Sequence, residues 1–268
     1  MQRAARILLS SAAATLLLGT GAAFATEPCG DFGECKALVE INSTDGDIGF
    51  HFLMDGDDLN FARIKDPNGD KVFEDQAKGP LLEQKLTETF AESAEPLCWA
   101  DPEADEDEEI VTLEEFADRW ATGTYTFEGM GDGGEKSAGE TELTFDLPAA
   151  PDVSFDGSTI SWTPGDDLGN CGSAADLDAL VADGVLSTHP EDVPVAAWEA
   201  VIESGSSKLT FRVPASVSSV TVPPQWLAAF GSDTPGKIEV GAIGVDDNAT
   251  FSEEDVCINE DEGCEEDA

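Results

Sequence analysis

The stretch EINSTDGDIGFHFLMDGDD, residues 40–58, gathers five aspartates and one of the two histidines of the chain around an apolar run. Carboxylate oxygens at this density are the ligands that Ca²⁺ prefers. When the stretch is aligned with the twelve-residue calcium loop, Asp45 and Asp47 fill positions one and three. Phe50 then falls where the loop requires glycine, and Gly56 where it requires the final glutamate. The spacing argues against an EF-hand and predicts a β-strand between two aspartate-glycine turns.

The densest acidic segment is DPEADEDEE, residues 101–109, which carries seven carboxylates in nine residues. So many like charges favour a solvated loop. The alternative is a calcium loop between two strands, because oxygen donors are what Ca²⁺ requires. Its ligands would be Asp101, Asp105, Asp107 and Glu108. These four are weak calcium candidates, no metal site is assigned beyond them, and no other cofactor is expected.

Hydrolytic chemistry has little support in the sequence. The two histidines, His51 and His189, lie far apart and no G-x-S-x-G motif accompanies them, so a Ser-His-Asp triad is not predicted. Glycoside hydrolysis needs two carboxylates at a defined separation, but some pair among 57 acidic residues always meets that condition. No catalytic residue is assigned and the chain is expected not to be an enzyme. A carbohydrate-active hydrolase is the weaker alternative.

The first 25 residues have the pattern of a secretory signal peptide. Arg3 and Arg6 form a short basic region, residues 7–18 are apolar, and Ala23-Phe24-Ala25 is a small-x-small cleavage site. The apolar part is shorter than the ~20 residues of a membrane span. We therefore expect an exported chain, located in the periplasm, at the cell surface or outside the cell, whose mature part does not span a membrane.

Six cysteines in an exported chain predict disulfides. Loop length favours two local pairs, Cys29 with Cys35 and Cys257 with Cys264, which leaves Cys98 with Cys171. The sequence alone leaves the connectivity open. A zinc site is disfavoured, because neither a C-x-x-C pair nor a nearby histidine is present.

The charge of the chain excludes several classes of partner. Beyond the predicted signal peptide, 11 Lys and Arg stand against 57 Asp and Glu, a net charge of −46. Nucleic acids and anionic lipid surfaces are recognised through basic residues, so neither is an expected partner. The acid is spread along the whole chain, which favours a solvated surface suited to high ionic strength over a set of calcium sites.

The rest of the chain predicts an all-β protein. Hydrophobic residues make up 41%, and they form short runs separated by turn residues, the pattern of β-sandwiches. Phe50 and Phe52 alternate with His51, which is therefore expected to point away from the core toward solvent. The segments 55–58 and 66–70 are predicted turns. Thr112 and Glu115 form a capping box at the start of one short helix.

A Pro/Ala-rich junction at residues 147–153 predicts a domain boundary. We expect an N-terminal Ig-like β-sandwich over 26–149 and a second domain over 150–252. The second domain contains an insertion at 165–193 with a helix near its centre. The acidic tail, 253–268, is expected to be poorly ordered apart from its cysteine pair.

The second half resembles a fibronectin type III domain. Pro151 and Val153 stand where its first strand begins, Trp162 in ISWTP matches its core tryptophan, and Trp198 in VAAWEAVIE stands at the aromatic position of its third strand. SVTVPPQWL and KIEVGAIG resemble its later strands. Gly236 replaces the tyrosine that usually forms a corner bond before the sixth strand.

The first half resembles the N-terminal region of functionally uncharacterised exported bacterial proteins that also carry a fibronectin type III-like domain. The resemblance lies in VEINSTDGDIGFHFLMDGD, DPNGDKVFE and TETFAESAEP. It implies tandem Ig-like and fibronectin type III-like sandwiches. By fold analogy, it also implies a non-enzymatic binding, adhesion or structural module. Its partner would be a protein or polysaccharide at the envelope, and a calcium-stabilised cell-surface protein is the alternative.

If the excess acid is an adaptation to salt, the melting temperature of the mature chain should rise as NaCl increases from ~0.1 M toward ~1 M. Over that range the Debye length falls from ~10 Å to ~3 Å, which screens repulsion between the acidic residues. Thermal denaturation followed by circular dichroism measures the effect. A flat or falling dependence on salt contradicts the hypothesis.

Overall fold

The structure is a computed structural model that describes residues 29–101, 109–231 and 234–259. The described part is built mainly from β-strands in two consecutive sets. The first set is β1 (Glu34–Asn42), β2 (Asp47–Leu59), β3 (Phe61–Lys65), β4 (Lys71–Gln76), β5 (Leu86–Glu92), β6 (Gly123–Met130) and β7 (Lys136–Leu143). The second set is β8 (Asp152–Phe155), β9 (Thr159–Thr163), β10 (Val195–Ser204), β11 (Ser207–Pro214), β12 (Ser219–Thr221), β13 (Thr234–Gly244) and β14 (Ala249–Ile258). The α-helices are α1 (Pro80–Gln84), α2 (Leu113–Arg119), α3 (Ala174–Asp183) and α4 (Pro224–Leu227).

The two sets of strands have the same topology. In each set, the first, second and fifth strands lie in one sheet, and the fourth, third, sixth and seventh strands follow one another in the other. Each half of the chain is thus a sandwich of three strands against four. The predicted fold class, two Ig-like or fibronectin type III-like β-sandwiches in tandem, is confirmed.

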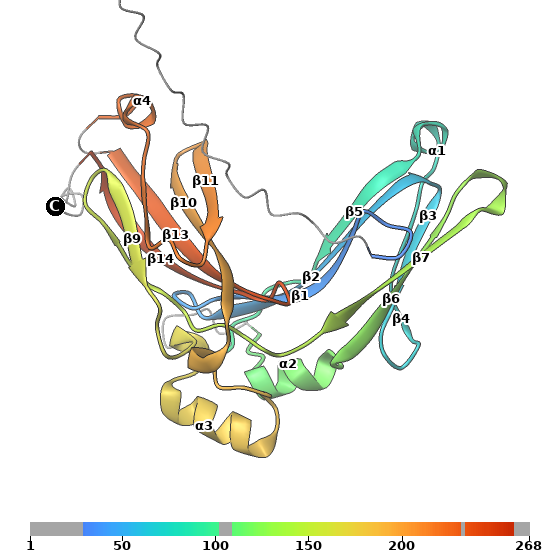
Figure 1. Cartoon of the computed structure of the whole chain (residues 1–268), viewed down its shortest axis with the longest axis horizontal. Helices are drawn as coiled ribbons and strands as arrows, with labels where there is room; N and C mark the ends of the chain where they lie inside the picture. Colours follow the sequence, from blue (N-terminus) through green and yellow to red (C-terminus); the bar gives the residue numbers. More distant parts are fainter. Residues whose placement is uncertain (1–28, 102–108, 232–233, 260–268) are drawn as a thin grey trace, which may run out of the picture.

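The two sandwiches share a sheet. The first strand, β1, pairs in parallel with the last strand, β14, through the partners Glu40 with Ala249, Ile41 with Thr250 and Asn42 with Phe251. This pairing joins the three-stranded sheet of the first sandwich to the four-stranded sheet of the second, in the order β11-β10-β13-β14-β1-β2-β5. Figure 1 shows a V-shaped molecule in which this shared sheet lines the inner side of both arms.

Each sandwich has its own core. In the first, Val39 and Ile41 of β1 and Phe50 of β2 point inward, and Phe50 stacks on Trp120 just after α2 with ring centroids 3.9 Å apart. In the second, Trp162 and Trp198 are both buried, with ring centroids 6.0 Å apart. The alternation of buried and half-buried positions along β1 is what a strand with one face on a core requires.

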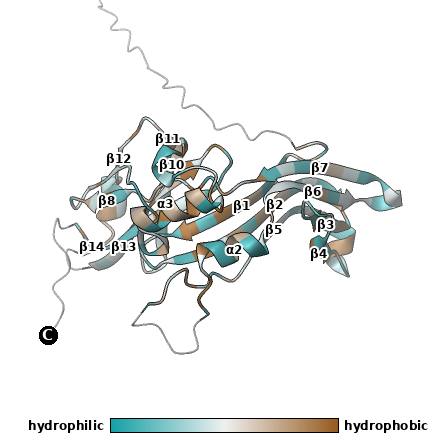
Figure 2. Ribbon diagram, turned by 90° about the horizontal axis from the view of Figure 1, so that it is seen from below, coloured by the Kyte–Doolittle hydropathy of each residue, from teal (hydrophilic) through white to brown (hydrophobic). Residues whose placement is uncertain are grey.

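The insertion of the second sandwich packs against the first. Leu168, Leu177 and Leu186 belong to the core of the first sandwich, and both views place α3 close to α2 at the base of the V (Figures 1 and 2). The disulfide between Cys98 and Cys171 ties the insertion to the loop that follows β5.

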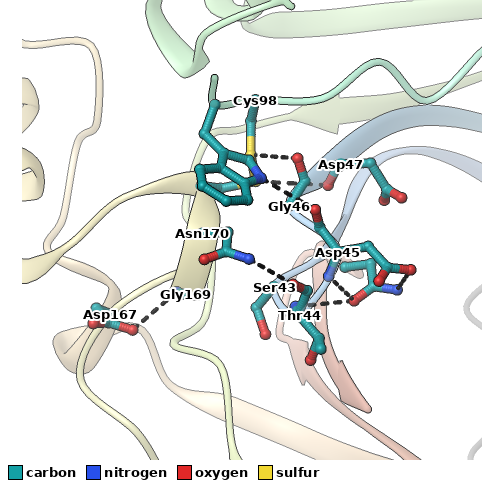
Figure 3. Close-up of a disulfide and its surroundings, with 12 residues drawn as sticks. Ser43, Thr44, Asp45, Gly46, Asp47, Cys98, Asp167, Gly169 and Asn170 are labelled. Atoms are coloured by element: carbon teal, nitrogen blue, oxygen red, sulfur yellow. Dashed lines mark hydrogen bonds between the residues drawn. A yellow bond between two sulfur atoms is a disulfide. The ribbon is translucent and has the colours of Figure 1, made fainter. Parts of the chain in front are cut away.

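Contacts beside this disulfide reach the β1–β2 turn. The side-chain amide of Asn170 donates to the carbonyl of Thr44 at 2.6 Å, as Figure 3 shows. Gly169 adopts a φ of +60°, and a Cβ at this position would lie 2.4 Å from the carbonyl oxygen of Ser43. Only glycine therefore allows the insertion to approach the turn this closely.

Asn248, in the turn between β13 and β14, is fully buried between the two halves. Its Oδ1 accepts from the backbone N–H of Val39 at 2.8 Å. Its Nδ2 donates to the carbonyls of Thr144 at 3.1 Å and Asp146 at 3.3 Å. The side-chain amide of Asn248 thus forms hydrogen bonds with the backbone of β1 and with the backbone of the segment that connects the two sandwiches.

Two expectations are corrected. Residues 55–58 do not form a turn, because β2 continues through them to Leu59 with an irregular register after Asp55. A Cβ at Gly56 would lie 2.6 Å from the ring of Phe32, so the bulged strand accommodates this aromatic residue of the Cys29–Cys35 loop. The tail does not begin at Glu253, because β14 extends to Ile258 and pairs with β13 along its length. The remaining domain boundaries stay a prediction.

None of the helices in the described ranges is long and apolar enough to cross a membrane.

Substituting Asn248→Ala is predicted to lower the melting temperature by about 5–10 °C. The change leaves the N–H of Val39 and two carbonyls without a buried partner, a loss of roughly 2–3 kcal/mol. Thermal denaturation of the full chain measures it. The exposed turn residue Asn68 serves as the control, and Asn68→Ala should shift the melting temperature by less than ~2 °C. An Asn248→Ala variant as stable as this control would contradict the role assigned to Asn248.

Candidate functional site

A hollow of about 430 Å³ lies on the exposed face of the shared sheet, where the two arms meet. We call it the acidic hollow. It is lined by eight carboxylates, two lysines, one amide and two apolar residues: Glu40, Asp45, Asp47, Glu92, Glu95, Glu199, Glu239, Glu253, Lys208, Lys237, Asn42, Val201 and Phe251. These residues come from both sandwiches, so the hollow exists only because β1 and β14 pair.

Small residues of the shared sheet form the base of the hollow and leave its space open. Opposite Glu40 the cross-strand partners are Gly49 on β2 and Ala249 on β14. A Cβ at Gly49 would come within 2.9 Å of the side chain of Glu95, and one at Gly241 would come within 2.4 Å of the ring of Phe251. Glycine at these two positions leaves room for the longer side chains that line the hollow.

The crowding of carboxylates raises the pKa of several of them. Burial, followed by repulsion from Glu95 and Glu92, raises the pKa of Glu40 to about 7. Burial, followed by repulsion from Glu95 and Asp45, raises the pKa of Asp47 to about 6. Perturbed carboxylates gathered in one hollow are a signature of functional sites. Part of the acid in the hollow is thus held in an unfavourable ionised state near neutral pH.

The two lysines compensate only part of this charge. Lys237 donates to Glu253 at 2.8 Å, and this bond raises the pKa of Lys237. Lys208 lies 3.8 Å from Glu239. Burial still raises the pKa of Glu239 although both lysines lower it. With eight carboxylates against two lysines, the hollow is a strongly negative surface suited to binding cations.

His51 does not line the hollow but lies beside it, next to Glu40, Glu92 and Glu95, and corrects an expectation. It points to the opposite side of the sheet from Phe50 and Phe52, as predicted, but it is only 9% exposed. Its Nδ1 lies 3.9 Å from Glu40, and its Nε2 lies 3.8 Å from Glu92 and 3.7 Å from Glu95. In the described part of the chain, Nε2 has no hydrogen-bond partner. Glu95, which follows β5, and the neighbouring carboxylates cover a side chain that alternation alone would place in solvent.

The calcium candidates of the 101–109 segment stay a prediction. Asp105, Asp107 and Glu108 lie outside the described residues, and Asp101 is half-buried. The structure does not bring Asp101 into the acidic hollow. His189 lies in the insertion, 4.0 Å from Glu191, and not in the hollow.

Two predicted disulfides join described cysteines, and both are present, Cys29–Cys35 and Cys98–Cys171. Cys257 is buried in β14, and Cys264 lies outside the described residues, so the third pairing stays a prediction.

The acidic hollow itself was not predicted. Period-two alternation could have placed Glu40 and His51 on one face of a hairpin. The parallel pairing of β1 with β14, more than 200 residues later, leaves no local signal in the sequence.

No protein-family model matches the chain. No curated protein matches it either. The solved structures to which the chain is similar include the following three. The FN1–FN3 domains of chicken CNTN1 share 11% identity, with 88% of this chain and 68% of that one covered and a TM-score of 0.30. A two-domain fibronectin type III segment of chicken tenascin shares 10% identity, with 83% and 98% covered and a TM-score of 0.27. A bacterial ice-binding adhesin shares 10% identity, with 88% and 66% covered and a TM-score of 0.25. At these values the likeness carries no argument, and the fold assignment rests on the strand order.

The raised pKa of Glu40 predicts a pH-dependent effect of Glu40→Gln. The folded state holds a proton on Glu40 up to about pH 7, whereas an unfolded glutamate loses it near 4.5. The folded state therefore binds more protons between these values, so this contribution to stability falls as pH rises through the window. The side chain is 35% exposed. After allowance for screening, we expect the neutral variant to be more stable at pH 8 by roughly 1–2 kcal/mol, or ~2–6 °C.

The melting temperatures of wild type and Glu40→Gln are measured in EDTA at pH 8 and at pH 5. The difference should shrink toward zero at pH 5, where Glu40 is protonated in the folded state. Exposed Glu140 is the control, and Glu140→Gln should show no such pH dependence. A variant less stable than wild type at pH 8 contradicts the predicted sign.

Proposed function

We propose that the chain is an exported, non-enzymatic binding module that recognises a positively charged partner through the acidic hollow. The main support for this proposal is the concentration of eight carboxylates on a sheet to which both sandwiches contribute strands. Disulfides and the predicted signal peptide support export. The partner that fits this chemistry is a basic protein segment at the envelope or in the medium.

The rigidity of the junction supports a binding role. The β1–β14 pairing, the Cys98–Cys171 disulfide and the buried amide of Asn248 all connect the two sandwiches. A preorganised surface loses little conformational entropy when it binds. The carboxylates are therefore already positioned for a partner, and their combined field steers cationic segments toward the hollow.

A second hollow, of about 630 Å³, lies over β3, β4, β6 and β7 and contains several of the basic residues. Two of its three cations are paired with carboxylates of the same hollow. Lys65 lies 2.6 Å from Glu128, and Arg63 lies 3.1 Å from Glu74. Three basic residues stand against two acidic ones in this hollow, whereas eight carboxylates stand against two lysines in the acidic hollow. The acidic hollow has the larger charge imbalance and is the stronger candidate for recognition.

The test measures the affinity of the mature chain for dodecalysine by isothermal titration calorimetry in EDTA at ~0.15 M NaCl. The hollow variant combines Asp45→Asn, Glu199→Gln and Glu239→Gln. A matched control removes three exposed acids elsewhere with Glu83→Gln, Glu114→Gln and Glu140→Gln. Three partly exposed ion pairs contribute about 1.5 kcal/mol, so the hollow variant should bind ~10-fold more weakly and the control within ~2-fold of wild type.

Equal weakening in both variants would show that dodecalysine responds only to the net charge, which contradicts recognition by the hollow. Immobilised wild type and hollow variant are then exposed to envelope protein fractions and a polysaccharide panel. A polysaccharide retained equally by both proteins would contradict the proposed partner class.

A further inference from the structure

His51 is the most unusual polar side chain of the exposed sheet face. It is buried, and its Nε2 has no hydrogen-bond partner among the described residues. Buried polar groups in folded proteins nearly always have one. Three carboxylates surround the ring at 3.7–3.9 Å, too far for hydrogen bonds to it. Nε2 thus faces carboxylate oxygens of Glu92 and Glu95, and Nδ1 faces one of Glu40.

The spacing of these groups fits a metal ion. Glu40, His51 and Glu95 each offer one ligand atom, and these atoms lie within 4.8 Å of one another. In a tetrahedral site with bonds of about 2.0–2.1 Å, the ligand atoms are roughly 3.3–3.4 Å apart. Side-chain movements of less than ~1 Å would close the difference. Glu92, whose Oε1 lies 3.8 Å from Nε2, is a further carboxylate beside these three residues.

The strands hold Glu40, His51 and the neighbouring Glu92 in register, whereas Glu95 follows the end of β5. His51 and Glu92 are direct cross-strand partners on β2 and β5, and Glu40 lies diagonally across β1. Gly49 leaves the space that Glu95 occupies. Ligands that project from paired strands are held more precisely than ligands on loops.

The ligand types identify the class of metal. Ca²⁺ and Mg²⁺ take oxygen ligands almost exclusively, whereas imidazole suits Zn²⁺ and other first-row transition metals. We propose that Glu40, His51 and Glu95 form a binding site for a divalent transition-metal ion, with Zn²⁺ as the probe. The site goes beyond the proposed function and does not depend on a cationic partner.

The test uses the mature chain without a histidine tag, freed of metal with EDTA and dialysed into buffer with 5 mM MgCl₂ (about the level that occupies weak carboxylate sites). Zn²⁺ is titrated by calorimetry into wild type, His51→Gln and Glu95→Gln. His189→Gln and Glu140→Gln are the controls, because each removes a residue of the same type away from the site. We expect one site per chain, Zn²⁺ affinity at least ~10-fold lower in the first two variants, and no change in the controls.

Two further measurements keep the outcome decisive. Co²⁺ should produce visible absorption bands in wild type that are absent in His51→Gln, and CaCl₂ should not displace Zn²⁺. If His51→Gln does not fold, Glu95→Gln decides, because Glu95 is partly exposed. Wild type that binds Zn²⁺ no better than these variants, or that loses it to CaCl₂, overturns the metal site. Dodecalysine binding in EDTA should be unchanged in His51→Gln, so the metal site and the proposed function can fail separately.

Discussion

The parallel pairing of β1 with β14 is the interaction on which the rest of the molecule depends. Each sandwich alone would present an edge strand at this point, with a row of unpaired backbone groups. The pairing covers both edges at once and converts a three-stranded and a four-stranded sheet into one sheet of seven. The first and last strands of the described chain therefore stabilise each other, although more than 200 residues separate them.

Other features of the chain reinforce this junction. The insertion of the second sandwich contributes Leu168, Leu177 and Leu186 to the core of the first, so the two cores are not independent. The Cys98–Cys171 disulfide and the hydrogen bonds of Asn248 add further connections between the two halves. The same geometry concentrates negative charge, because acidic residues that each sandwich alone could keep apart face one another across β1 and β14. Glu199 and Glu239 of the second sandwich thus add to the burial, and to the repulsion from Glu95 and Glu92, that raise the pKa of Glu40.

The sequence predicts what depends on local patterns. Alternation along β2 identifies a strand with Phe50 and Phe52 inward, the capping box at Thr112 and Glu115 is present at α2, and the insertion contains α3. Trp162 and Trp198 lie in the second core, as the fibronectin type III resemblance implies. The bulge near Gly56 was missed because its cause is the ring of Phe32, a contact with another segment. The acidic hollow and the burial of His51 were missed for the same kind of reason, since their neighbours arrive through long-range pairing and through Glu95, which lies beyond the strands.

The direction of the β1–β14 pairing has a mechanical consequence. In a parallel pair, the start of one strand and the end of the other lie at opposite ends of the ladder. A force that pulls the start of β1 away from the end of β14 acts along the strands and loads all hydrogen bonds between them in shear. In an antiparallel pair, the same two strand ends would lie at one end of the ladder, and the force would break the hydrogen bonds one after another. The fold therefore has a shear-resistant pairing between the start of β1 and the end of β14, the first and last strands of the described chain.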